Sequence, residues 1–168
     1  MTSAWTSPEL PANSVEMSEK NVWWGGELPR IDQMTAAGAA SMPGFLGIEF
    51  TDVGPGHVTA RMPVNERTMQ PFGRIHGGAS VVLAETVGSV AASYALDRSK
   101  FVAVGMEINA NHARPAYDGF VHATATPENI GRTTQIWSIR ITDDAGKLVC
   151  ISRITMAVIP RDRGVKND

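Results

Sequence analysis

Cysteine is nearly absent from this sequence: one, Cys150, occurs in 168 residues. A single cysteine excludes an intramolecular disulfide and any cysteine-rich zinc site. The composition suits a reducing compartment, so we expect a cytoplasmic protein. Because Cys150 alternates with Leu148 and Ser152 in a predicted strand, it is more typical of a packed side chain than of a nucleophile.

The sequence also lacks an excess of charge and any long apolar run. Its formal net charge is -2 with a pI ≈ 6.1, and its lysines and arginines are scattered. Such a pattern predicts neither nucleic-acid binding nor attachment to a membrane surface. No apolar stretch approaches the roughly 18 to 20 residues of a membrane span, and no basic and apolar leader opens the sequence. The partners that we expect are small molecules and copies of the same chain.

The length predicts one domain with a hydrophobic core. Residues 1–29 mix Pro, Ser, Gly and Glu without a sustained period, which indicates a loosely ordered extension. Trp23 and Trp24 offer the alternative that this extension is pinned to the domain or to a neighbouring subunit. We expect the domain itself over residues 30–160 and a C-terminal tail over residues 161–168.

Hydrophobic periodicity predicts one long helix among antiparallel strands. A short helix over 32–40, with Asp32 as its candidate cap, ends before Pro43 and Gly44. The helix over 77–96 is apolar nearly all the way round, which is typical of a buried helix. The predicted strands cover 47–53, 57–64, 101–112, 120–126, 133–142 and 148–159. This order predicts an α+β domain in which the sheet wraps the long helix.

One carboxylate, Glu85, interrupts the apolar helix. Its helical neighbours are Val81, Val82, Gly88 and Ser89. An ionised carboxylate in a dry site is costly, so Glu85 is expected to have a raised pKa, to accept hydrogen bonds, or to face a cleft. The alternative is a polar residue that closes a subunit interface or pairs with an arginine.

Three neighbours of Glu85 favour a site of acyl transfer. The "HGG" at 76–78 stands at the start of the helix, where free N–H groups and the helix dipole attract a carbonyl oxygen or an oxyanion. Ser89 lies one turn beyond Glu85, and the amide of Gln70 can donate to a carbonyl. A carboxylate, oxyanion donors and a positioned water are the parts that acyl transfer needs.

The stretches "QPFGRIHGGASVVLAETVGSVA", "GMEINANHARPA" and "IGRTTQIWSIRITDDAGKLVCISR" resemble the hot-dog-fold acyl-CoA thioesterases. Within them, the chain is similar to the branch of glutamate-type 4-hydroxybenzoyl-CoA thioesterases and 1,4-dihydroxy-2-naphthoyl-CoA hydrolases. The resemblance covers roughly residues 30–160. It implies an antiparallel sheet wrapped around one long helix, homodimers with active sites at the subunit interface, and pairs of dimers.

The resemblance also implies roles for individual residues. Glu85 attacks the thioester carbonyl or activates water, the N–H of Gly77 polarises that carbonyl, Gln70 and His76 orient it, and Ser89 assists the water. Coenzyme A is then part of the substrate, and no separate cofactor is expected. Contacts with substrate and coenzyme A are implied for Gly105, His112, Arg114, Asn129, Gly131, Arg132 and Thr133.

Alternatives remain for several of these residues. From its position alone, His76 is either a catalytic base or an orienting group. The spacing of His76, Glu85 and His112 matches no short metal motif, so we expect no metal site. Arg114 and Arg132 either bind phosphates of coenzyme A or belong to a solvated face.

Two other functions compete with thioester hydrolysis. A hot-dog dehydratase or hydratase is expected to carry a motif like "HFPxxPxxPG" before the helix. This sequence has "QPFGRIHGG" there instead. A non-catalytic acyl-CoA-binding protein of the same fold would not need the set of Glu85, Gly77, Gln70 and Ser89. We therefore expect a thioesterase, acting on an aromatic acyl-CoA.

Overall fold

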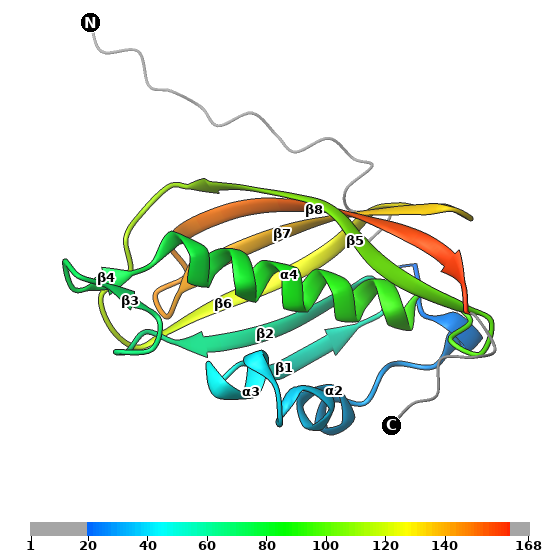
Figure 1. Ribbon diagram of the computed structural model, residues 1–168, viewed down its shortest axis with the longest axis horizontal. Coiled ribbons are helices and arrows are strands. Elements are labelled where there is room, and N and C mark those ends of the chain that lie inside the picture. Colours follow the sequence, from blue (N-terminus) through cyan, green and yellow to red (C-terminus); the bar gives the residue numbers. More distant parts are fainter. Residues whose placement is uncertain (1–19, 162–168) are drawn as a thin grey trace, which may run out of the picture.

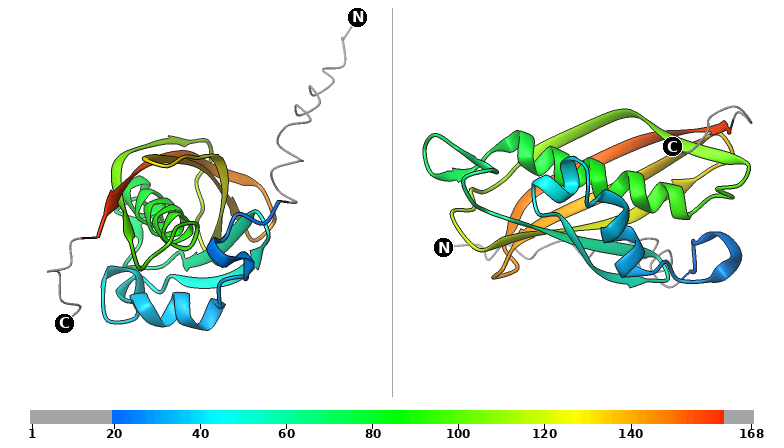
Figure 2. Two further views of the ribbon diagram at one scale, coloured as in Figure 1. Left: turned by 90° about the vertical axis from the view of Figure 1, so that its right-hand side faces the viewer. Right: turned by 60° about the horizontal axis from the view of Figure 1, so that its bottom comes forward.

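A six-stranded antiparallel sheet curves around a single long helix, α4 (Gly77–Tyr94), in the computed structural model, which describes residues 20–161 (Figures 1 and 2). The order of strands is β1-β2-β6-β7-β8-β5. Their bounds are β1 Glu49–Gly54, β2 His57–Pro63, β5 Phe101–His112, β6 Phe120–Ile130, β7 Thr134–Asp143 and β8 Leu148–Pro160. The predicted α+β architecture is confirmed.

The inward face of the sheet supplies most of the core. Side chains that alternate along β2, β6 and β7 are buried, as their period of two predicts. They are Val58, Ala60, Met62, Val121, Ala123, Ala125, Trp137, Ile139 and Ile141. Each of these three strands therefore turns an apolar row toward α4 and a more polar row outward.

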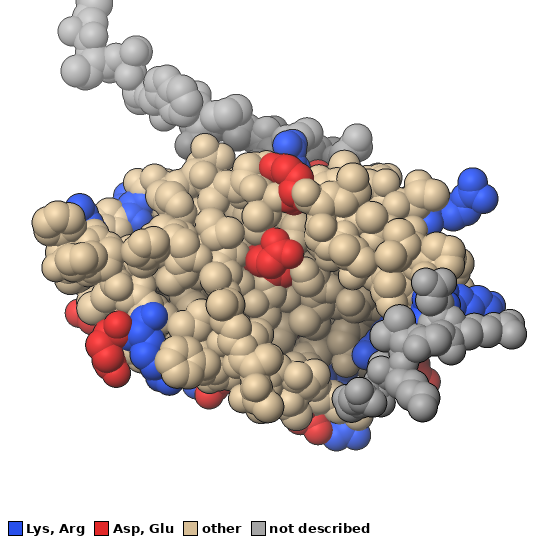
Figure 3. Space-filling view, in the orientation of Figure 1, with Lys and Arg blue, Asp and Glu red and all other residues tan. Residues whose placement is uncertain are grey.

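Small residues let α4 lie close to this sheet. Leu83, Ala84 and Val87 are buried against it, and a Cβ on Gly88 would lie 2.6 Å from Cγ2 of Ile154. The opposite stripe of the helix, which includes Glu85, is only half-buried. The sheet thus wraps α4 as predicted, but this stripe faces a groove between β5 and the helices α2 and α3 (Figure 3), and its Thr86 and Val90 line a pocket with these helices.

A β-bulge changes which side chains of β5 face the core. Strict alternation along residues 101–112 predicts that Val104, Met106, Ile108 and His112 share one face, and this prediction is wrong. Gly105 pairs with Met156 and Glu107 pairs with Thr155, so Met106 is the extra residue. A bulge inserts one residue and reverses the alternation beyond it. Ile108 packs against the core, whereas the side chain of Val104 is exposed.

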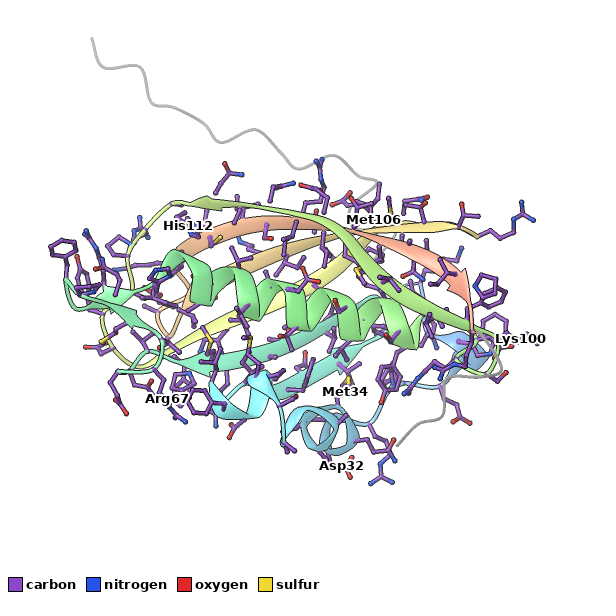
Figure 4. The ribbon with its side chains drawn as sticks, in the orientation of Figure 1. Asp32, Met34, Arg67, Lys100, Met106 and His112 are labelled. Carbon is purple, nitrogen blue, oxygen red and sulfur yellow. The ribbon has the colours of Figure 1, made fainter. Side chains whose placement is uncertain are left out.

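Two short helices lie beside the groove: α2 (Ile31–Gly38) packs on β1, and α3 (Met42–Phe45) contacts α2 and α4. Met34 is directed into the core and Asp32 away from it (Figure 4). Asp32 is not the predicted helix cap, because the helix begins one residue earlier at Ile31. Its carboxylate instead accepts a 2.6 Å hydrogen bond from Arg30, within the first turn. Pro43 and Gly44, expected beyond the helix, form part of α3.

Trp23 attaches the end of the N-terminal extension to the sheet. Its ring is buried, stacks on Trp137 with centroids 6.2 Å apart, and donates a 2.7 Å hydrogen bond from Nε1 to the carbonyl of Gly54. Trp24 is exposed. The pinned alternative therefore holds for Trp23, while residues 1–19 and 162–168 lie outside the described residues. In the described part, residues 20–161, no helix is both long enough and apolar enough to cross a membrane.

Candidate active site

A pocket of about 390 Å³ opens at the N-terminal end of α4. A small hairpin, β3 (Met69–Gln70) and β4 (Arg74–Ile75), forms one side of it, and the end of β5 forms another. Figure 4 shows His112 beside the start of the helix and Met106 further along β5. The pocket brings together five of the predicted site residues: Gln70, His76, Gly77, His112 and Arg114.

Hydrogen-bond donors converge on this pocket. The N–H of Gly77, in the first turn of α4, makes no hydrogen bond within residues 20–161. Nδ1 of His76 accepts a 2.8 Å hydrogen bond from the N–H of Gly78, which leaves Nε2 as the protonated nitrogen of the neutral ring. Because its basic nitrogen is already used, His76 fits the orienting role better than that of a general base.

The amide of Gln70 is oriented in a similar way. Its Oε1 accepts a 2.7 Å hydrogen bond from the N–H of Phe72, so the NH₂ group is the free end of the amide. Gln70, His76 and Gly77 therefore each retain a donor at the pocket. Such an array binds a carbonyl oxygen and stabilises the negative charge that develops on it.

Glu85 and Ser89 lie further along the helix. Ser89 Oγ donates to Oε1 of Glu85 at 3.3 Å, and Oε1 lies against the backbone of Gly105 in β5. Glu85 follows Gly77 by eight residues, which is about 12 Å along the axis of α4. One thioester carbonyl cannot contact both positions of a single chain. The predicted contacts of one carbonyl with Gly77 and with Glu85 therefore require residues of two subunits, as the resemblance implies, and they stay a prediction.

The predicted coenzyme A residues at the turn between β6 and β7 form a third group. Gly131 N donates to the carbonyl of Thr134, and Thr133 accepts from Val158 N, so both belong to the turn. Arg132 and Thr133 are exposed, as is Asn129. Two strands, β7 and β8, separate β6 from β5 in the sheet. The single chain does not bring this turn to the pocket at the start of α4.

Sequence reasoning missed Arg74, which lines the pocket. Arg74 is paired with Gln70 across the hairpin of β3 and β4. The signal for it was the short spacing around "PFG", which allows a tight turn between the two residues. With Arg114, it gives the pocket two guanidinium groups at its exposed rim.

The groove face around α4 and β5 is mostly uncharged, with acidic side chains near its middle and both basic and acidic ones near its margins (Figure 3). Cys150 is buried, and this burial raises the pKa of its thiol, consistent with a packing role. His57 and His122 each contact an aspartate, Asp52 and Asp144, at the surface. Among residues 20–161 no cluster of three or more potential metal ligands occurs.

Comparison with known proteins places this geometry among thioesterases. Residues 72–150 match the family described as the Thioesterase superfamily. A 1,4-dihydroxy-2-naphthoyl-CoA hydrolase of Escherichia coli is 46% identical over 77% of this chain and 94% of its own length. A hydrolase of the same name from Listeria monocytogenes is 47% identical over 67% of this chain and 91% of its own.

Solved structures agree with the sequence relatives. A mutant thioesterase from Pseudomonas aeruginosa superposes with a TM-score of 0.81 and 46% identity, covering 83% of this chain and 99% of that one. A thioesterase from Haemophilus influenzae also gives 0.81, with 43% identity over 86% of this chain and 99% of that one. These likenesses confirm the hot-dog fold that the sequence resemblance implies.

Proposed function

The chain belongs to the Thioesterase superfamily, and we propose that this acyl-CoA thioesterase hydrolyses an aromatic thioester with Glu85 as its carboxylate. The observation that carries this assignment is the set of free donors at Gly77, Gln70 and His76. In water-assisted hydrolysis, the carboxylate takes a proton from water as the water oxygen attacks the carbonyl carbon. The C–S bond then breaks, the sulfur takes up a proton, and a carboxylic acid and coenzyme A leave.

Direct attack by Glu85 gives the same products through an anhydride that water then hydrolyses. Both routes need one carboxylate oxygen that is free to react. Oε1 accepts from Ser89, and Oε2 makes no hydrogen bond within the described part of the chain. Oε2 is therefore the reactive oxygen in the proposed mechanism.

We propose that two subunits share each active site. Support comes from the distance of about 12 Å along α4 between Gly77 and Glu85, which a single thioester cannot span. β5 is twelve residues long and lies at the edge of the sheet, where an unpaired strand can pair with another chain. Antiparallel pairing of β5 about a two-fold axis would bring Gly77 of the partner subunit toward Glu85. A pair of such dimers remains the expectation for the full assembly.

An apolar pocket of about 240 Å³ supports the proposal that the acyl group is aromatic. It lies between the helices α2, α3 and α4 and strand β1, with Met34, Ile48, Phe50 and Val90 among its lining residues. Thr86, which follows Glu85 in α4, lines it too. An apolar cavity of about 150 Å³ already holds a benzene molecule. We propose that the acyl ring enters here, as the names of the E. coli and Listeria relatives suggest for a naphthoyl group.

The remainder of the substrate would follow the donor pocket outward. Arg74 and Arg114 at its rim suit the phosphates of coenzyme A, because guanidinium groups bind phosphate oxygens in pairs. We propose that no metal or further cofactor takes part, since a carboxylate with oxyanion donors supplies the required chemistry. A chain whose one cysteine is buried also suits the cytoplasm.

The test is release of coenzyme A thiol from benzoyl-CoA, 1,4-dihydroxy-2-naphthoyl-CoA, phenylacetyl-CoA and straight-chain acyl-CoAs. Glu85→Gln keeps the shape of the side chain and should lower kcat by about 10²-fold to 10⁴-fold. Glu27→Gln changes an exposed carboxylate outside β5 and outside both pockets, so it is the matched control and should turn over normally. Normal turnover by Glu85→Gln would remove the carboxylate from the mechanism, and binding without hydrolysis would favour an acyl-CoA-binding protein.

A further inference from the structure

Gly105 leaves open the space that the carboxylate of Glu85 occupies. A Cβ at position 105 would lie 2.8 Å from Oε1 of Glu85, which is closer than a Cβ approaches an atom to which it is not bonded. The φ angle of Gly105 is not positive, so the backbone itself does not require glycine here. Position 105 is also exposed, so tight packing in the core does not require it either. Apart from the two adjacent residues of the chain, the carboxylate of Glu85 is the only group of residues 20–161 that lies within 4 Å of this Cβ.

The bulge at Met106 is what turns position 105 toward the helix. Gly105 pairs with the buried Met156, and His112 pairs with the buried Cys150, so both face α4. Seven residues separate them, and in a regular strand an odd separation would place them on opposite faces. Because Met106 is an extra, unpaired residue, the alternation shifts by one and both residues lie on the same face. One strand therefore presents His112 to Gly77 and Gly105 to Glu85.

We propose that Gly105, together with the bulge at Met106, is a positioning residue for the carboxylate of Glu85. The missing side chain lets Oε1 rest between the backbone of β5 and Ser89 Oγ, 3.3 Å away. This contact fixes the rotation of the carboxylate and turns Oε2 toward the substrate. The inference rests on the proposed function of Glu85 but is distinct from it, because Gly105 itself touches no reacting atom.

An added methyl group at position 105 forces the end of the Glu85 side chain to move. The end of a glutamate is flexible, so it can move without disturbing the fold. A displacement of about 1 Å at a reacting group can cost about 10²-fold in rate. The expected signature is therefore a catalytic defect in a stable protein.

The experiment compares Gly105→Ala with wild type in steady-state hydrolysis of the best acyl-CoA from the panel. We expect kcat to fall by about 10-fold to 100-fold, with KM within about 3-fold and with an unchanged oligomer and Tm. Gly88→Ala is the matched control, because its Cβ would meet Cγ2 of Ile154 in the core at 2.6 Å. That variant should lower Tm instead.

A double-mutant cycle with Glu85→Asp isolates the contact. The shorter aspartate withdraws its oxygen from position 105, so Gly105→Ala should change kcat by less than about 2-fold in that background. Wild-type kcat in Gly105→Ala would overturn the proposal, as would an equal loss of kcat in both backgrounds. Neither outcome would contradict the proposed catalytic role of Glu85. That role is contradicted only if Glu85→Gln remains active.

The cycle remains decisive if Gly105→Ala folds poorly. Truncation of the carboxylate in the double variant Glu85→Ala with Gly105→Ala removes the clash. If the double variant has the same Tm as the single variant Glu85→Ala, the result would support the contact between position 105 and the carboxylate. A double variant that still fails to fold would show that position 105 requires glycine for another reason, and would overturn the proposal.

Discussion

The imidazole of His112 lies against the backbone of Gly77, so that a Cβ at position 77 would sit 2.8 Å from its Nε2. Strand β5 and the start of α4 are thus in close contact at the pocket, although the two residues are 35 positions apart in the sequence. The contact holds the ring beside a backbone N–H that has no partner within the described residues. Glycine at position 77 therefore has two effects. It leaves room for the imidazole of His112, and it leaves its own N–H accessible as a donor.

Gly77→Ala should accordingly displace His112 and crowd the donor pocket. We expect kcat/KM to fall by about 10-fold to 100-fold while Tm changes little, because one oxyanion donor is worth about that much or more. Steady-state hydrolysis and thermal unfolding measure the two quantities. In a His112→Ala background, where the ring is gone, Gly77→Ala should cost less. An equal loss in both backgrounds would contradict the contact.

Subunit mixing tests whether two chains build each site. Glu85→Ala and Gln70→Ala are each expected to be nearly inactive. If Glu85 works with Gln70 of the partner subunit, each mixed dimer contains one intact site and one doubly damaged site. Random exchange should then restore about a quarter of the wild-type activity, since half the dimers are mixed. Activity that stays at the level of the separate variants after proven exchange would show that each site belongs to a single chain.

Val90→Phe should narrow the apolar pocket between α2 and α4. We expect kcat/KM for 1,4-dihydroxy-2-naphthoyl-CoA to fall by at least about 10-fold, because overpacking typically costs 1–3 kcal/mol. Hydrolysis of a short straight-chain acyl-CoA by the same variant serves as the internal control. An equal loss for both substrates would place the aromatic ring elsewhere.

Trp23→Ala should lower the free energy of unfolding by about 3–5 kcal/mol, because it deletes a buried indole and the hydrogen bond to Gly54. Trp24 is the matched control, since its side chain is 61% exposed. Trp24→Ala should change stability by no more than about 0.5 kcal/mol. Urea unfolding followed by circular dichroism compares them, and similar losses in the two variants would contradict the packing.

Cys150 should resist thiol reagents in the folded protein. Burial raises the pKa of its thiol, which lowers the fraction of reactive thiolate at any given pH below that pKa. We expect a chromogenic thiol reagent to label one thiol per chain in urea, and almost none without it on the time scale of the hydrolysis assay. Fast labelling of the native protein would contradict this burial and would also disturb the thiol-release assay.

Local pattern was sufficient for much of the fold. Alternation along "HVTARMP" and "TQIWSIRIT" predicted strands whose inward rows are buried, because a period of two places successive side chains on opposite faces. The apolar stretch around Glu85 predicted the central helix, and the glycines of "HGG" marked its start. The resemblance of these stretches then indicated the family, which the relatives and solved structures confirm.

Where sequence reasoning failed, a distant contact had decided the outcome. Met106 fits an alternating strand by pattern, but pairing with β8 makes it a bulge. Trp23 lies in a stretch of low predicted order, yet Trp137 supplies a surface on which it stacks. The roles of the predicted site residues remain predictions, although their orientations can now be stated.

The sequence by itself determined the period of each element, the helix that carries Glu85, and the donors at its start, because these depend on neighbours within a few residues. Only the tertiary structure decided which oxygen of Glu85 rests on Gly105, that the imidazole of His112 lies against Gly77, and that Gln70 lines the same pocket. Those relations depend on how β5 and the hairpin meet α4, and strand register and side-chain contacts of that kind are set by packing between distant segments.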